Sequence, residues 1–319
     1  MPSFSCTVEQ GIAAGLRLDR YAADYLKIMS RSQIKPRNLE AHLNGRPVKI
    51  SRILKEGDRL ELSWKEAAPV FLLPEKLPLD VLYEDDRVIV LNKAQGMVVH
   101  PGSGNRQGTL ANALLYRRII KFSSEINGEY AFDSADGNFA ASGTRPGIVH
   151  RLDKDTSGVI IAAWDEEAHA FLSTQFKERT VKKTYAALVK GRPRDSEGCI
   201  DTLIARSRRD RKTFAVSEKE GRRSVTRYKL VRSCGNYSLL LIRPSTGRTH
   251  QIRVHLKYLG NPILGDPIYG FVDRQFANLT LMLHAKRLSL VLPGDSVPKT
   301  FRTHLPERFI NFMRTGRER

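Results

Sequence analysis

The sequence predicts an α+β protein with one large domain and a smaller N-terminal one. The chain of 319 residues is longer than a usual single domain. In its larger part, strand-like segments follow one another with few helical segments between them, which argues against a doubly wound parallel sheet. Three prolines, at positions 69, 74 and 78, predict an extended spacer. We expect domains at 1–68 and 78–319, joined by a linker at 69–77.

The N-terminal segment has the pattern of two helices followed by a small hairpin sheet. Apolar residues recur at helical spacing over 16–26, and a second, basic segment opens at Ser30. Asn44-Gly45 is a strong turn signal, and Leu60–Trp64 alternates like a strand. On this pattern alone, a basic accessory domain with a protein partner remains an alternative to an RNA-binding module.

The large domain is expected to open with two strands and a glycine-rich loop. A short strand ends in the acidic turn at 84–86, a buried strand follows at 88–91, and the loop covers 93–104. This loop contains neither GxxxxGK[ST] nor a GxGxxG followed by a helix, so no nucleotide cofactor is expected. An amphipathic helix at 109–118 and a long polar loop at 121–144 come next.

A charged turn at 150–158, HRLDKDTSG, lies between two strand-like segments. It carries Asp153 directly after a cation, Arg151, and an apolar residue, and a second acid, Asp155, follows two positions later. A turn this charged suits the presentation of a functional group. The alternative is a surface turn whose aspartates bind their own backbone.

The segments after this turn are mostly strands, with a few helices between them. Strands are expected at 182–190, 224–231, 237–242 and 281–290, and a last helix at 307–313. Asp165 is expected to begin a helix as its N-cap. The apolar face of that helix would consist of Ala168, Phe171, Leu172 and Phe176.

A second helix is expected between Thr249, as its N-cap, and Gly260, as its C-cap. One of its faces carries three cations, because their spacing of three and four residues places them side by side. A solvated face would explain such a cluster, yet Thr-Gly-Arg at the start of the helix and the glycine- and proline-rich loop after it are suited to aiming side chains. The three residues are His250, Arg253 and Lys257.

The charge of the chain favours a nucleic-acid partner. It has 53 basic and 34 acidic side chains, a net charge of +19, and residues 177–232 alone hold 18 Lys and Arg against 7 Asp and Glu. A clustered excess suits a phosphate track better than a generally solvated face, because each neutralised phosphate adds affinity irrespective of sequence. The arginines expected along this track are Arg208, Arg209, Arg211, Arg222 and Arg223.

The cysteines, the N-terminus and the lengths of the apolar segments restrict the classes to which the protein can belong. Cys6, Cys199 and Cys234 lie far apart without a CxxC pair, so neither a disulfide framework nor a zinc site is expected. The N-terminus lacks the pattern of a signal peptide. No apolar run approaches the roughly 20 residues of a membrane helix. We expect a cytoplasmic monomer with no membrane partner.

Five motifs occur in a fixed order along the chain, YEDDRVIVLNK, HRLDKDTSG, KKTYAALVKG, STGRTHQIRVHLKYLGNPILGDPIYG and LHAKRLSLVLP. Together they closely resemble the RluA family of RNA pseudouridine synthases, and the resemblance spans 78–305. Residues 1–68 resemble an accessory RNA-binding domain of many members, named after ribosomal protein S-four (the α-L motif). The resemblance implies the pseudouridine synthase α+β fold, a mixed, largely antiparallel sheet with a central RNA cleft.

The resemblance also implies an isomerase that flips specific uridines out of structured RNA and converts them to pseudouridine, with no metal and no cofactor. Asp153 would be the catalytic carboxylate. Tyr185 would stack on the flipped base and assist proton removal from its carbon 5. Arg253 would pair with Asp153 and keep it ionised, since a nearby cation favours the charged form of a carboxylate.

RNA contacts would come from several further side chains. Arg151 would help to evict the uridine and hold the opened RNA, and Arg248 and His250 stand at the entrance of the cationic helix. Arg31 would serve in the N-terminal module. Large-subunit ribosomal RNA is the first expected substrate and transfer RNA the second.

Two other functions are alternatives to this one, and the chain departs from the family pattern at two places. A hydrolytic glycosylase would use Asp153 and Asp155 as its carboxylate pair, and a non-catalytic RNA-binding or ribosome-assembly factor would need no intact site. Ala94 stands where the family usually has proline, which predicts a less rigid loop. The loop at 121–144 is longer than the family leads us to expect, which would alter RNA access.

Overall fold

A computed structural model of the protein divides into two compact units, Met1–Phe71 and Leu72–Arg319, and each is described by itself. Arg208, Arg211 and positions 123–144 of the expected polar loop lie outside the described residues. The described residues are 1–9, 11, 15–29, 31–35, 37–65, 72–102, 104–122, 147–207, 209–210, 213–270 and 279–315.

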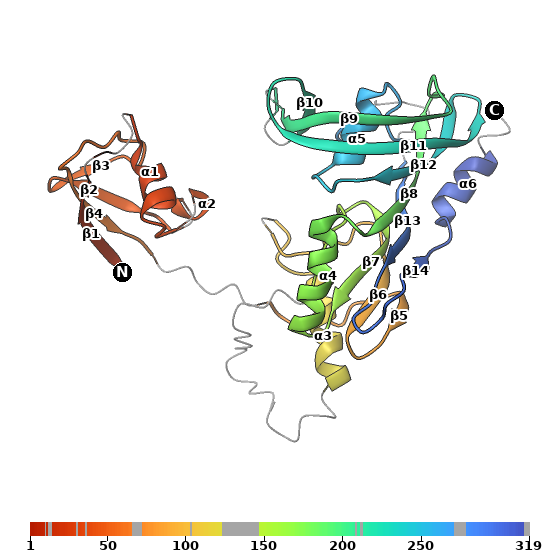
Figure 1. The fold of residues 1–319 in the computed structure, drawn as a ribbon, viewed down its shortest axis with the longest axis horizontal. Coiled ribbons are helices and arrows are strands. Elements are labelled where there is room, and N and C mark those ends of the chain that lie inside the picture. The colour runs from red at the N-terminus through yellow and green to blue at the C-terminus, as the bar shows by residue number, and fades with distance from the viewer. Residues whose placement is uncertain are drawn as a thin grey trace. The chain divides into compact units, whose positions relative to one another are not determined.

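The first unit is a small antiparallel sheet with short helical segments (Figure 1). The expected two helical segments and hairpin are present, and Asn44 and Gly45 form the hairpin turn with positive φ angles of 54° and 75°. Leu18 and Leu60 are fully buried in its own core. Its elements are β1 (Ser3–Thr7), α1 (Leu18–Arg20), the π-helical η1 (Tyr21–Tyr25), α2 (Arg31–Ile34), β2 (Glu40–Leu43), β3 (Arg46–Val48) and β4 (Arg59–Ser63).

The second unit is built on a ten-stranded sheet within its described residues, with the strand order β10-β9-β11-β12-β8-β13-β7-β6-β5 and β14 beside β13 (Figure 1). All strand pairs are antiparallel except β13 with β7. The predicted mixed, largely antiparallel sheet is therefore confirmed. The strands are β5 (Val81–Glu84), β6 (Val88–Lys93), β7 (Ser157–Ala163), β8 (Lys182–Lys190), β9 (Glu197–Arg206), β10 (Phe214–Ser217), β11 (Arg222–Cys234), β12 (Tyr237–Pro244), β13 (Leu283–Leu290) and β14 (Lys299–Arg302).

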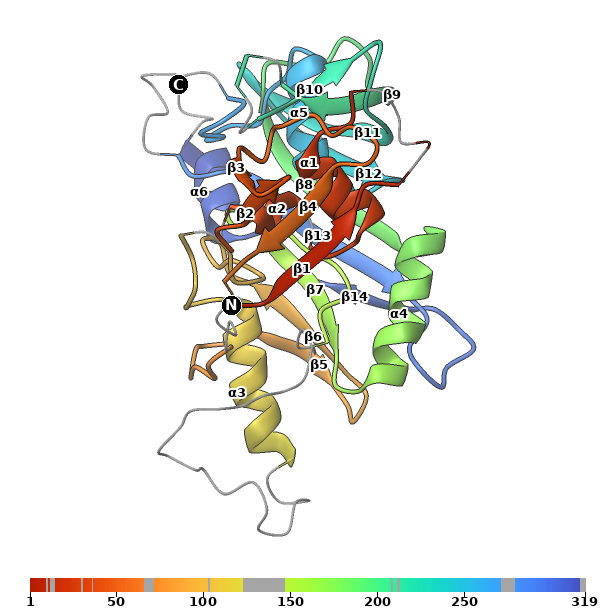
Figure 2. The same ribbon diagram turned by 90° about the vertical axis from the view of Figure 1, so that its left-hand side faces the viewer.

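In the described part of this unit, four helices pack on the sheet: α3 (Leu110–Phe122), α4 (Glu166–Glu178), α5 (Gln251–Tyr258) and α6 (Glu307–Thr315). Helices α3 and α4 cover opposite faces of β6 and β7, as Figure 2 shows. The period of two explains this: Val88 and Val90 pack with α4, while Ile89 and Leu91 pack with α3. A strand that is covered on both faces carries apolar residues in succession. The apolar run at 88–91 predicted such a buried strand, and β6 contains it.

Helix α4 begins as predicted, because the Asp165 carboxylate accepts a hydrogen bond of 2.7 Å from Ala168 N. Its predicted apolar face is wrong at Phe171, which is 39% exposed. Ala168, Leu172 and Phe176 form an i, i+4, i+8 stripe against the sheet, and Phe171 lies to the side of that stripe.

Residues 72–77, which the sequence assigns to the linker, contact helix α3. Asn112 Nδ2 donates to Leu73 O at 2.7 Å, and Glu75 N donates to Asn112 O at 3.1 Å. The Glu75 carboxylate also accepts from Gly108 N, just before the helix, at 3.0 Å. Among the described residues, no helix is long and apolar enough to cross a membrane.

Candidate active site

The charged turn at 150–158 leads directly into β7 and is anchored on both sides of Asp153. Leu152 is buried in the core beneath α3. His150 stacks on Phe176 of α4 with ring centroids 4.5 Å apart, and its Nε2 accepts from Ile161 N at 3.1 Å. Burial and the nearby Lys183 lower the pKa of His150 to about 3, so the ring is neutral and suited to accept this bond.

The turn itself is closed by main-chain groups. Thr156 N donates to Asp153 O at 3.1 Å, and Asp155 contributes its carbonyl oxygen to Gln95 Nε2 at 2.9 Å. The Asp153 side chain remains 20% exposed. The turn therefore presents one carboxylate, that of Asp153, to a cavity of about 490 Å³.

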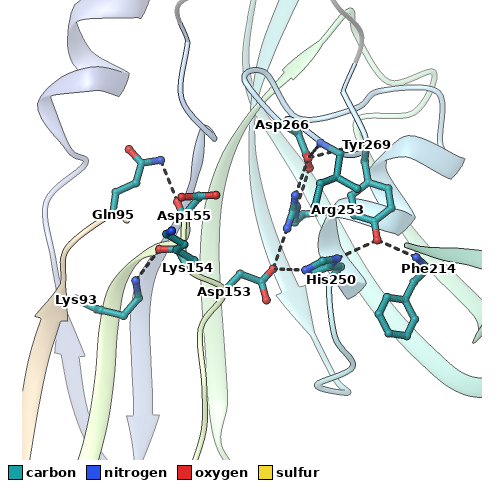
Figure 3. Close-up of polar contacts among 11 residues, drawn as sticks. Lys93, Gln95, Asp153, Lys154, Asp155, Phe214, His250, Arg253, Asp266 and Tyr269 are labelled. Atoms are coloured by element: carbon teal, nitrogen blue, oxygen red, sulfur yellow. Dashed lines mark hydrogen bonds and ion pairs between the residues drawn. The ribbon is translucent and has the colours of Figure 1, made fainter. Parts of the chain in front are cut away.

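The glycine-rich loop after β6 clamps this turn from one side (Figure 3). Gly96 N donates to Lys154 O at 2.9 Å. Lys93 is 2% exposed, and burial lowers its pKa to about 8 against the opposing effect of Asp155 and Asp153. Its Nζ donates, at 2.8 to 3.0 Å, to the carbonyl oxygens of Ala94, Met97 and Lys154.

Helix α5 brings a cation to the other side of the turn. Arg253 Nη1 lies 3.3 Å from Asp153 Oδ2. The same guanidinium donates through Nε and Nη2 to Asp266, at 2.8 and 2.7 Å. The side chain of Arg253 is 4% exposed and that of Asp266 is fully buried. The predicted pairing of Arg253 with Asp153 is present, and the stronger partner, Asp266, was not foreseen.

The start of α5 differs from the prediction. His250 is its N-cap, with a left-handed φ of 55°, and no side-chain cap hydrogen bond forms there. Thr249 is therefore not the N-cap. Gln251, the first residue of the helix, instead fixes the segment before it, since its Oε1 accepts from Arg248 N at 3.1 Å and from Thr246 Oγ1 at 2.7 Å. The left-handed residue lets the chain turn sharply into the helix.

His250 points back into the site from this position (Figure 3). Its Nε2 lies 3.9 Å from Asp153 Oδ2, and its Nδ1 lies 2.9 Å from the Tyr269 hydroxyl. The pKa of His250 is lowered, chiefly by burial, although Asp153 opposes this. The three residues predicted to share a face of α5 all contact Tyr269. His250 bonds its hydroxyl, and Arg253 and Lys257 lie 5.1 and 5.8 Å from its ring centroid.

Tyr185 comes to the same cavity from the middle of β8. Burial and the charge of Asp153 raise its pKa, so its hydroxyl stays protonated. Six of the predicted site residues thus line one cavity, whose volume suits a ligand of nucleotide size. They are Arg151, Asp153, Tyr185, Arg248, His250 and Arg253.

Among the described residues of the second unit, three further predicted RNA-binding arginines do not line this cavity: Arg209, Arg222 and Arg223. Arg222 and Arg223 are exposed on β11, and Arg223 pairs with Asp201 of β9 at 2.6 Å. Arg209 is exposed between β9 and β10. Arg31 belongs to the first unit, where its Nη2 lies 3.1 Å from Asp19 Oδ2.

Several residues of the site were not singled out from the sequence. Asp266 and Tyr269 lie in the LGDPIYG segment, whose Asp-Pro pair signals a turn: Asp266 Oδ1 accepts from Ile268 N and Tyr269 N at 2.9 and 3.0 Å. Lys93 has the strand register of Ile89 and Leu91, which indicates an inward side chain. Three further cations line the cavity: Lys177, Arg179 and Lys183. No group of three or more His, Cys, Asp or Glu suited to a metal occurs in the described part of the chain.

The chain is similar to known proteins over most of its length. Residues 87–258 match the family model of RNA pseudouridylate synthase. The chain is 42% identical, over 93% of its length and 89% of the relative, to the ribosomal large subunit pseudouridine synthase D of Borreliella burgdorferi. It is 35% identical, over 96% of its length and 95% of the relative, to the protein of the same name from Zymomonas mobilis.

A solved structure shares the fold. Human RNA pseudouridylate synthase domain containing 4 superposes with a TM-score of 0.56 and 25% identity, over 75% of this chain and 93% of the human one. The match to the family model, residues 87–258, contains the whole turn at 150–158, Tyr185 of β8 and Arg253 of α5. The protein belongs to the RNA pseudouridylate synthase family and is an isomerase that converts uridine in RNA to pseudouridine.

Proposed function

We propose that this synthase modifies large-subunit ribosomal RNA and that Asp153 is its catalytic carboxylate. The proposed role of Asp153 is supported by one observation: Asp153, Tyr185 and Arg253 converge on one cavity, with Arg253 Nη1 3.3 Å from Asp153 Oδ2. The names of the two relatives from B. burgdorferi and Z. mobilis support the first part.

The chemistry suits a single carboxylate. Isomerisation breaks the bond from ribose carbon 1′ to base nitrogen 1 and forms a bond from carbon 1′ to base carbon 5. One proton leaves carbon 5 and one is gained at nitrogen 1, so nothing is oxidised or hydrolysed. In this proposal the Asp153 carboxylate acts on the ribose and frees the base to rotate. Arg253 keeps Asp153 ionised and oriented, because it approaches one oxygen, Oδ2, and leaves Oδ1 for the substrate.

Tyr185 is proposed to stack on the flipped base and to assist the loss of the proton from carbon 5. Its raised pKa keeps the hydroxyl neutral, so that Tyr185 provides a ring and a hydrogen-bonding group beside the carboxylate. Flipping a base costs a few kcal/mol of lost stacking, and Arg151 is proposed to stabilise the opened RNA.

The cations around the cavity support a polyanionic substrate. Phosphates next to the flipped nucleotide would meet the flank formed by α4, β8 and the start of α5, where Lys183 lies partly buried. Arg209, Arg222 and Arg223 would extend the phosphate track along β9 to β11. We propose that residues 1–68, with Arg31, form an α-L RNA-binding domain. Cytoplasmic location, monomeric state and the absence of a cofactor stay predictions of the sequence.

A tritium-release assay tests this proposal. RNA labelled at uridine carbon 5 is incubated with the protein, as large-subunit ribosomal RNA and as transfer RNA, and product nucleosides are separated. We expect tritium release with pseudouridine in ribosomal RNA. Pseudouridine in transfer RNA alone would refute the substrate assignment, free uracil would indicate a hydrolase, and tight binding without release would indicate a binding factor.

A further inference from the structure

A chain of polar contacts runs from β10 to the candidate catalytic carboxylate (Figure 3). Phe214 N donates to the Tyr269 hydroxyl at 3.0 Å. That hydroxyl lies 2.9 Å from His250 Nδ1, and His250 Nε2 lies 3.9 Å from Asp153 Oδ2. The sequence predicts an RNA contact for His250, and the position of its ring gives it a different role.

The Tyr269 hydroxyl has one hydrogen to donate, and its surroundings decide where this hydrogen goes. Phe214 N–H already occupies one oxygen lone pair. Tyr269 is 3% exposed and burial is the first cause of its raised pKa, so the hydroxyl keeps its hydrogen. In the part of the chain that the structure describes, the hydrogen-bond acceptor beside it is His250 Nδ1.

A donating hydroxyl determines the tautomer of the histidine. If Nδ1 accepts, the single proton of the neutral ring is on Nε2, which faces Asp153. In the opposite tautomer Nδ1 would carry a proton, so the Tyr269 hydrogen would lose its acceptor, and the Nε2 lone pair would face an anionic carboxylate. Both changes are unfavourable, so the contacts on the two sides of the ring select the same tautomer.

We propose that Tyr269 fixes His250 as the neutral tautomer with its proton on Nε2, and that His250 thereby positions the Asp153 carboxylate. This inference rests on the proposed role of Asp153. His250 and Arg253 both approach Oδ2, from adjacent turns of α5. The charged groups around His250 are Asp153, Arg253, Asp266 and Arg151. At 3.9 Å the His250 contact is longer than a hydrogen bond, as catalytic contacts often are before substrate binds.

The Asp266 loop supports both donors. Asp266 holds Arg253 through two hydrogen bonds and accepts from Tyr269 N. The Tyr269 ring is also held beneath the Arg253 guanidinium, 5.1 Å from its centroid. One loop thus orients the arginine directly and the histidine through a hydroxyl.

Nitrogen-15 NMR of the full-length protein, labelled in its histidine rings, tests the tautomer without any activity measurement. We expect the His250 signals of the neutral Nε2–H form, assigned by their loss in His250→Asn. In Tyr269→Phe we expect a mixture of tautomers. Tyr83→Phe is the matched control, because it removes a hydroxyl bonded to Asp85 at 2.7 Å on β5, at the far edge of the sheet, and should leave the His250 signals unchanged. An Nδ1–H ring in the wild-type protein, or unchanged signals in Tyr269→Phe, would overturn the proposal.

A pair of substitutions at His250 tests positioning against a merely structural role. Gln places its amide N–H near the position of Nε2, whereas Asn reaches only the position of Nδ1. The left-handed φ of 55° favours Asn over Gln, so backbone strain alone would make the Gln variant the poorer one. We expect the opposite: single-turnover pseudouridine formation falls by about tenfold or more in His250→Asn and is largely restored in His250→Gln, while RNA affinity changes little in both.

The results separate this inference from the proposed function. Equal rates for the Asn and Gln variants, or a loss confined to RNA affinity, would contradict positioning of Asp153 by His250. If the wild-type protein modified no RNA, the proposed function would fail, and the wild-type NMR spectrum would still decide the tautomer.

Discussion

Asp266 holds Arg253 by two hydrogen bonds, at 2.8 and 2.7 Å, on the side of the guanidinium away from Asp153. Burial raises the pKa of Asp266, but the hydrogen bonds from Arg253 outweigh this and hold it below its ordinary range. Asp266 is therefore charged, and it directs the remaining Nη1 group at Asp153. The orientation of the candidate catalytic carboxylate depends on this buried pair.

Replacing Asp266 with Asn should weaken both folding and catalysis. The variant keeps the size of the side chain but leaves the guanidinium of Arg253 without its buried counter-charge. We expect the free energy of unfolding to fall by about 3 kcal/mol and the single-turnover rate to fall by about tenfold or more. Urea denaturation and quench-flow assays measure the two effects.

Asp201→Asn provides the matched control for that variant. Asp201 forms a similar ion pair with Arg223, at 2.6 Å, but on the exposed surface of β9 and β11, where ion pairs contribute little to stability. Its unfolding curve should match that of the wild-type protein. Equal destabilisation by the two Asn substitutions would show that burial does not make the Asp266–Arg253 pair contribute more to stability than an exposed ion pair.

The sequence predicted those parts of the site that local sequence patterns encode. The strand at 182–190 and the charged turn were placed correctly because apolar alternation and turn residues are local signals. Asp266 and Tyr269 were missed, since their partners Arg253 and Phe214 come from other elements. Thr249 was placed wrongly as a cap because a left-handed His250 cannot be foreseen from capping preference. Phe171 was assigned to the buried face of α4, but the contact between this helix and the sheet is too narrow to include it.

Lys93→Met should loosen the turn that carries Asp153. The substitution removes the ammonium that binds three carbonyl oxygens, including that of Lys154. We expect a lower single-turnover rate at unchanged RNA affinity, because the carboxylate is less well positioned. Lys121→Met is the control, since Lys121 binds Asp85 O at the other end of the unit. A large loss of RNA affinity in Lys93→Met would contradict a positioning role.

The same variant should change the pH dependence of stability. Lys93 has its ordinary pKa of 10.5 in the unfolded chain and a pKa of about 8 in the folded protein. Between these values the unfolded state binds more protons, so a rise in pH stabilises the folded state. We expect the free energy of unfolding of the wild-type protein, relative to Lys93→Met, to increase from pH 8 to 10.5. A flat difference would show that Lys93 is not buried as a charged group.

Tyr185→Phe and Tyr185→Ala should separate the ring from the hydroxyl. Phe keeps the stacking surface, so RNA affinity should stay within about twofold of the wild-type value while tritium release slows. Ala removes the ring as well and should weaken binding, because base stacking on an aromatic ring contributes about 1–3 kcal/mol. Full activity of Tyr185→Phe would argue against a role of the hydroxyl in proton removal.

The basic track on β11 should control the salt dependence of RNA binding. Removing two phosphate contacts in the double variant Arg222→Ala/Arg223→Ala should reduce the slope of log affinity against log salt by about 1.5. Arg302→Ala, which removes an exposed arginine of β14, should leave the slope unchanged. Filter binding over a series of salt concentrations gives the slopes, and an unaltered slope in the double variant would place the phosphate track elsewhere.

We propose that Asp153, and not its neighbour Asp155, is the catalytic carboxylate. Single-turnover pseudouridine formation by Asp153→Asn and Asp155→Asn, measured on RNA that the wild-type protein modifies, tests it most directly. We predict that Asp153→Asn binds this RNA normally and loses at least about a hundredfold in rate, while Asp155→Asn keeps most of its activity. Wild-type activity in Asp153→Asn, or an equal loss in both variants, would exclude Asp153 as the single catalytic carboxylate.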